Sequence, residues 1–373
     1  MSKRFTPIFG KWFVLSLFSL VLSIGFLSCG DDTEEVLPAP DFDRAAMLAS
    51  VADNLIIPNF TALQASVDVL STATNEFVTN TTEENLTGLR TAWVQAVTDH
   101  QYCSAFGFGP ADLLLGEYAK VLGAFPVSES KIEGNILVSD YNLANSFDLD
   151  VRGFYGVEYL IYGNGQSDSE LVAGFDQNRK DYLVLIVDEL KTNFDNIVGE
   201  WTSTYRQEFV SNDETSSGSP ISLYYNGFVK DYENIKNFKV ELPAGLTADQ
   251  ETPDGSLVAA FYSGISRDLI IEHFENSKNI YFGLTRDGDE IIGFEEYLEA
   301  AIGGPELVAQ TKEAVTRIDA AIADLPEGRL SDNIESDKLV TLRDELQDNT
   351  ANFKSSVVSL LGLTITFNSG DGD

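Results

Sequence analysis

The segment 153–163, GFYGVEYLIYG, places one carboxylate, that of Glu158, inside an otherwise apolar and aromatic stretch. Tyr155 and Glu158 are three residues apart, so on a helix they project from one face and can share a ligand or a hydrogen bond. Because a Glu side chain is rarely buried unpaired, we expect a donor or a cation beside Glu158.

Two chemistries suit this pair. A phenolate and a carboxylate are hard oxygen donors, so Tyr155 and Glu158 could together contact ferric iron, which they suit better than zinc or copper(I). Alternatively, the Tyr155 hydroxyl only satisfies the buried Glu158. Zinc is disfavoured, because the chain has two histidines, His100 and His273, and neither stands in an HExxH motif.

Three neighbouring or similarly spaced side chains are further candidates. Arg152 adjoins the segment and could pair with Glu158 or hold an anionic ligand. His100 and Cys103 share a helix face at a spacing of three residues and could join a metal site. We expect instead that His100 is partly exposed and that Cys103 is a small thiol of the core.

The segment 153–158 resembles the GxHxxE signature of the imelysin family, bacterial envelope proteins linked to iron uptake and formerly classed as peptidases. Tyr155 stands where the family has His. Residues 56–60, the Phe/Gly/Pro corner at 106–110 and the C-terminal stretch 361–373 also resemble the family, in the same order along the chain.

The resemblance implies a non-enzymatic binding protein linked to iron uptake or homeostasis, with its site between two helical bundles near Tyr155 and Glu158. A metallopeptidase is the enzymatic alternative, which the missing His disfavours. An accessory lipoprotein that assists another envelope protein, including other iron-uptake proteins, is the third. Possible site neighbours under the resemblance are Ser263, Arg267 and Asp268, on a helix predicted to begin near residue 257, and the terminal carboxylates of Asp371 and Asp373.

Apolar residues recur at intervals of three and four along most of the chain, and no alternating strand pattern persists, so we predict an all-α fold. With the resemblance, this predicts two packed helical bundles, at 41–215 and 216–373, joined through the Ser- and Gly-rich linker 212–220. Pro58 should interrupt the first helical pattern, and residues 123–142 look irregular. The later predicted helices cover 171–209, 221–238, 257–281, 305–324 and 336–361.

The N-terminus has the pattern of a secretory signal. Three basic residues precede an apolar run from Trp12 to Leu27, which is short for a membrane span. Cys29, between Ser28 and Gly30, resembles the lipidation site of a bacterial lipoprotein; the alternative is an ordinary cleaved signal. We therefore expect a signal peptide at 1–28, a lipid anchor on Cys29, an acidic tether at 29–40 and a location in the cell envelope, on the outer membrane, its periplasmic side or the cell surface.

The net charge of the chain limits the classes of molecule that it is expected to bind. Without residues 1–28, the chain keeps 59 acidic and 21 basic residues, a formal charge of −38. Nucleic acid and anionic membrane surfaces are therefore disfavoured, so the expected membrane contact is through the lipid on Cys29. Such a field attracts cations, which suits metal capture, but it also serves solubility alone.

Overall fold

This computed structural model describes residues 40–113, 118–139, 143 and 148–367. The regular secondary structure in these residues is helical. Within these residues two isolated β-bridges occur, Thr247 with Gln250 and Leu284 with Glu290, and no strand. The prediction of an all-α fold is confirmed. The signal peptide, Cys29, most of the tether, Asp371 and Asp373 lie outside the described residues.

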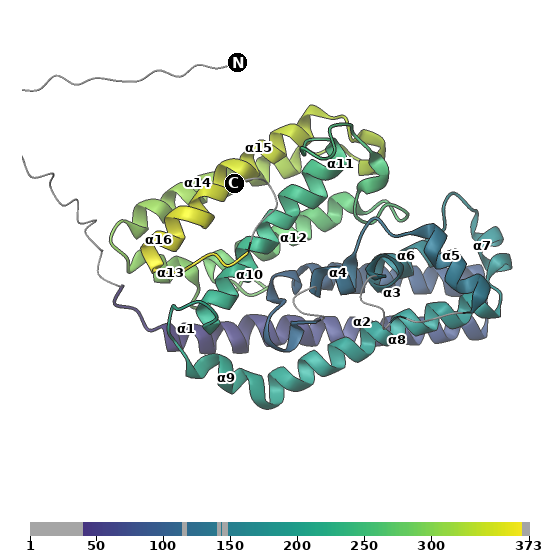
Figure 1. Cartoon of the computed structure of the whole chain (residues 1–373), viewed down its shortest axis with the longest axis horizontal. Coiled ribbons are helices and arrows are strands. Elements are labelled where there is room, and N and C mark those ends of the chain that lie inside the picture. The colour runs from purple at the N-terminus through teal and green to yellow at the C-terminus, as the bar shows by residue number, and fades with distance from the viewer. Residues whose placement is uncertain (1–39, 114–117, 140–142, 144–147, 368–373) are drawn as a thin grey trace, which may run out of the picture. The chain divides into compact units, whose positions relative to one another are not determined.

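The first bundle is centred on three long helices that lie side by side, α2, α3 and α8 (Figure 1). Their apolar stripes meet in a core that includes Leu63, Trp93 and Leu190, each fully buried. The helices of this bundle are α1 (Arg44–Val51), α2 (Ile57–Thr79), α3 (Glu83–Gln101), α4 (Tyr118–Gly123), α5 (Glu129–Val138), α6 (Gly153–Tyr162), α7 (Asp168–Gly174), α8 (Gln177–Glu200) and α9 (Arg206–Ser211).

The second bundle follows the non-helical residues 212–219, where the linker was predicted. In it α14 packs on α15, and its helix α12 also packs on α3 of the first bundle (Figure 1). The proposed boundary between 215 and 216 stays a prediction. The helices are α10 (Pro220–Asn234), α11 (Leu242–Ala244), α12 (Ser266–Phe282), α13 (Phe294–Glu299), α14 (Gly304–Ala323), α15 (Asp337–Ala351) and α16 (Val358–Leu361).

Local sequence explains where several helices begin and end. The Thr82 side chain caps α3 by accepting the backbone N–H of Asn85 at 3.2 Å, and Glu83 and Glu84 place negative charge in its first turn. Helix α6 ends before Gly163, whose φ of 66° is one that glycine adopts without strain. The glycine thus marks the end of α6.

Three local predictions were wrong. Pro58 does not end the first helical stretch, which runs on from Arg44 to Thr79; it lies directly after the π-helical segment 52–56, whose wider turn changes the regular hydrogen-bond pattern before the proline. Residues 129–138 form α5 inside a region predicted to be irregular. The helix expected from residue 257 begins only at Ser266, and a non-helical loop precedes it.

In the part of the chain that the structure describes, four π-helical segments continue or join the α-helices. Each adds residues to a turn and so shifts which side chains face the core, a feature that three- and four-residue spacing does not reveal. They are η1 (Ala52–Ile56), η5 (Trp201–Tyr205), η6 (Ile235–Glu241) and η9 (Asn352–Val357).

Among the described residues one helical stretch, Arg44–Thr79, is long and apolar enough to cross a membrane, but half of its most apolar window is buried in the fold, as in an ordinary core helix.

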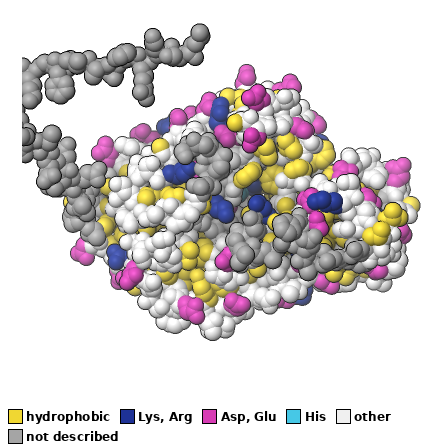
Figure 2. Space-filling model, viewed as in Figure 1, with side chains coloured by type: hydrophobic (Ala, Val, Ile, Leu, Met, Phe, Trp, Pro, Cys, Tyr) yellow, Lys and Arg dark blue, Asp and Glu magenta, His cyan; other side chains and the backbone are white. Residues whose placement is uncertain are grey.

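On the face shown in Figure 2, Asp and Glu side chains are scattered over many elements.

Candidate functional site

Helix α6, which carries Tyr155 and Glu158, lies inside the first bundle against α3, α4 and α8. Every residue from Gly153 to Ile161 is buried. Trp93 of α3 fixes the helix by donating its indole N–H to the carbonyl of Phe154 at 2.8 Å. Gly153 has a φ of 70°, and a Cβ there would lie 2.4 Å from the carbonyl oxygen of Leu122, so this start of the helix requires glycine.

Tyr155 and Glu158 both line a small pocket with a volume of about 20 Å³, which is room for about one water molecule. The pocket lies where α6 meets the loop before α12 and the chain after α4. Its walls are mostly aromatic or apolar. They consist of Phe125, Pro126, Val127, Tyr155, Glu158, Ser256, Val258, Ala260, Phe261 and Tyr262.

The donor beside Glu158 is Ser263. Its backbone N–H and its hydroxyl both donate to Oε1 of Glu158, each at 2.7 Å. The predicted neighbour Ser263 thus contacts the carboxylate, although it lies in the loop before α12 and not on a helix. These hydrogen bonds to Glu158 come from Ser263, and they do not support the alternative in which the Tyr155 hydroxyl satisfies this carboxylate.

Burial dominates the electrostatics of the pair. It raises the pKa of Glu158 to about 7, against the opposing effects of the hydrogen bonds from Ser263 and Tyr262 and of the positive charge of Arg329. Burial, and then the negative charge of Glu158, raise the pKa of Tyr155 well above its usual range. The phenol is therefore protonated at neutral pH, and a cation that binds its oxygen must displace that proton.

The Tyr155 ring packs edge-on against Phe125 at 5.3 Å between centroids, and its hydroxyl makes no hydrogen bond with another described residue. The Tyr155 hydroxyl and the Glu158 carboxylate therefore line the pocket together, whereas the hydroxyl of the other tyrosine in its walls, Tyr262, donates to Glu129 at 3.0 Å. No group of three or more His, Cys, Asp or Glu side chains with metal-binding geometry occurs among the described residues.

The other candidates near this site are Arg152, Arg267 and Asp268. Arg152 is buried and donates to Glu189 at 2.9 Å, and its predicted pair with Glu158 stays a prediction. The side chain of Arg267 is half-buried, and that of Asp268 is exposed on the first turn of α12.

His100 and Tyr155 both lie beside Gly123, a proximity that the sequence did not reveal. Measured from the position that a Cβ on Gly123 would take, Cε1 of His100 is 3.6 Å away and Cε2 of Tyr155 is 3.4 Å away. His100 is buried, not partly exposed as predicted, and burial lowers its pKa to about 3. Cys103 is fully buried, as expected of a core thiol.

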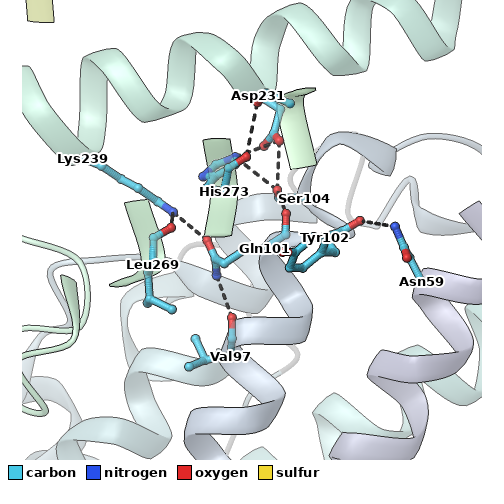
Figure 3. Close-up of polar contacts among 10 residues, drawn as sticks. Asn59, Val97, Gln101, Tyr102, Ser104, Asp231, Lys239, Leu269 and His273 are labelled. Carbon is cyan, nitrogen blue, oxygen red and sulfur yellow. Dashed lines mark hydrogen bonds and ion pairs between the residues drawn. The ribbon is translucent and has the colours of Figure 1, made fainter. Parts of the chain in front are cut away.

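A second polar cluster, also missed from the sequence, connects the bundles (Figure 3). Nε2 of His273 on α12 lies 2.7 Å from Oδ2 of Asp231 on α10 and 3.2 Å from Oγ of Ser104 in the first bundle. Because one nitrogen serves both partners, the group lacks the geometry of a Ser-His-Asp triad, which uses both ring nitrogens. Lys239 of η6 donates to Oε1 of Gln101 at 2.6 Å.

Comparisons of the sequence and of the structure with known proteins identify a family and similar folds. The imelysin family model matches residues 56–357. The comparison with curated protein sequences found no match. A crystal structure described as a "putative iron-regulated protein A precursor" from Parabacteroides distasonis ATCC 8503 is similar, with a TM-score of 0.71 and 17% identity over 87% of this chain and 97% of that one.

An imelysin-like protein from Psychrobacter arcticum 273-4 is also similar. Its TM-score is 0.71, its identity 18%, and the match covers 89% of this chain and all of that one. At such identity the two structures establish the shared fold.

Proposed function

Because this chain belongs to the imelysin family, we propose that it is a non-enzymatic binding protein of the bacterial cell envelope, linked to iron uptake or homeostasis. The proposed site is the pocket of Tyr155 and Glu158. One observation carries the proposal: a buried carboxylate and a phenol hydroxyl without a described hydrogen-bond partner line the same pocket.

The donors suit iron as a bound cargo. Phenolate and carboxylate oxygens are hard ligands, and a trivalent cation is the kind of ligand that can displace the proton of Tyr155. A similar structure belongs to a protein described as iron-regulated, which supports the connection to iron. The negative charge of the chain adds a field that concentrates cations near the protein.

A ferric titration followed by absorbance tests the proposal. We expect Fe(III) to produce a visible phenolate-to-iron charge-transfer band in the wild type, and Tyr155→Phe to remove it. Because Ser263 already satisfies Glu158, this substitution should leave the melting temperature nearly unchanged.

Tyr159→Phe is the matched control, since Tyr159 lies on the same helix and its hydroxyl instead donates to Glu133 at 2.7 Å. This variant should keep the band. A band that survives Tyr155→Phe, or no band in the wild type, would reject ferric binding through this phenol.

A further inference from the structure

The loop that forms one wall of the pocket is held from two opposite sides. On one side, Arg329, in the chain between α14 and α15, donates from its guanidinium to the carbonyl oxygens of Phe261 and Tyr262, the latter at 3.3 Å. The same guanidinium lies over the Phe261 ring, 5.9 Å from its centroid.

On the other side, the carboxylate of Glu158 accepts the backbone N–H of Ser263 at 2.7 Å, and the backbone N–H of Tyr262 also favours the charged form of this carboxylate and so lowers its pKa. The carbonyl of Phe261 and the N–H of Tyr262 belong to one peptide group. The carbonyl of Tyr262 and the N–H of Ser263 belong to the next. Each peptide group therefore has its negative end at the guanidinium and its positive end at the carboxylate.

We propose that Arg329 and Glu158 form an ion pair bridged by these two peptide groups, and that the pair holds residues 258–264 in place as a wall of the pocket. Oriented peptide dipoles between a buried anion and a cation stabilise both charges, although the two side chains do not touch. Arg329 is then a positioning residue, and its importance for ligand binding rests on the proposed function.

The backbone of the loop shows why such a fastening is needed. Ala260 has a φ of 55°, which costs energy for a residue with a side chain. Gly264 has a φ of 80°, and a Cβ there would lie 2.9 Å from Nη1 of Arg329. Close approach of the guanidinium thus requires glycine at 264, and interactions outside the loop must offset the strain at 260.

A double-mutant cycle in the full chain, without added metal, tests the bridged pair. Glu158→Gln keeps an oxygen that can accept from Ser263 but removes the charge. Arg329→Met removes the guanidinium. We expect Arg329→Met to lower the folding equilibrium constant, which denaturant unfolding measures. The factor by which this constant falls should be at least about fivefold larger in the wild type than in the Glu158→Gln background. Equal effects in both backgrounds would overturn the pair.

Amide hydrogen exchange gives a second readout. Exchange in residues 258–264 should accelerate in Arg329→Met, and Arg329→Lys, which keeps the charge, should restore part of the protection. Arg317→Met is the control, because Arg317 of α14 pairs with Glu345 and not with this loop. Unchanged exchange in Arg329→Met would contradict the proposal. Since neither measurement uses iron, a failure here is distinct from a failure of the ferric titration.

Discussion

At the scale of single residues, the chemistry of this chain depends on charges that are buried and still supplied with partners. Glu158 is almost completely buried and accepts two hydrogen bonds from Ser263. Lys239, which is also buried, donates to Gln101 and to the carbonyl of Leu269. In both cases a group from the other bundle satisfies the charge, so these contacts also join the bundles.

Lys239 leads to a prediction about stability and pH. Burial lowers its pKa from 10.5 to about 7, and the attraction of Asp231 opposes this only in part. Between pH 7 and 10.5 the unfolded chain therefore holds a proton that the folded chain lacks. The free energy of unfolding should rise with pH in this window, by about 1.4 kcal/mol per unit from this group, and the contribution is lost as the pH falls to 7.

Lys239→Met should remove this rise, which denaturant unfolding at several pH values between 7 and 9.5 would measure. Lys338→Met is a suitable control, because Lys338 is half-exposed and pairs with Asp324 at the surface. An identical pH slope in wild type and Lys239→Met would show that Lys239 does not titrate as its burial implies.

At the scale of elements, the sequence predicted the helices well and the loops poorly. The apolar spacing identified the long helices. The start of α12 was misplaced because residues 257–265 carry apolar side chains that face the pocket and neighbouring elements from a loop, so their spacing imitates a helix.

The site itself was only half predictable. Tyr155 and Glu158 could be paired from their spacing, since a helix places residues three apart on one face. The contact of Glu158 with Ser263 spans 105 residues and depends on the packing of two bundles, so no local pattern encodes it. The hydrogen bonds from Arg329 to the loop go to backbone carbonyls, which leave no complementary acidic residue to recognise in the sequence.

The polar junction between the bundles was missed for a similar reason. Lys239 lies in the π-helical segment η6, where the wider turn shifts the side chains from the positions that regular helical spacing predicts. Its partner Gln101 lies at the end of α3, in the other bundle. Propensity and periodicity describe each helix alone and do not specify which helices meet.

At the scale of the whole molecule, we propose from the family, the acidic charge and the N-terminal pattern that the protein lies in the cell envelope and meets cations there. The lipid anchor is a proposal from sequence, since Cys29 lies outside the described residues. The folded part would then be attached to the membrane through this cysteine and the acidic residues that follow it.

Metabolic labelling with a fatty acid in a bacterial host checks the anchor. The wild type should incorporate the label and partition with membranes, because the cysteine after Ser28 would be lipidated, and Cys29→Ala should do neither. Cys103→Ala is the control, since Cys103 is a fully buried thiol and its loss should leave labelling intact. Equal labelling of wild type and Cys29→Ala would exclude this attachment.

The central claim is that the pocket of Tyr155 and Glu158 binds ferric iron, and locating the metal tests it most directly. Crystals of the protein soaked with Fe(III) should show an anomalous difference peak, at the iron absorption edge, within bonding distance of the Tyr155 hydroxyl oxygen and a Glu158 carboxylate oxygen. The peak should be absent from Tyr155→Phe crystals treated in the same way. Iron found only at surface carboxylates, or a peak that persists in Tyr155→Phe, would contradict the account.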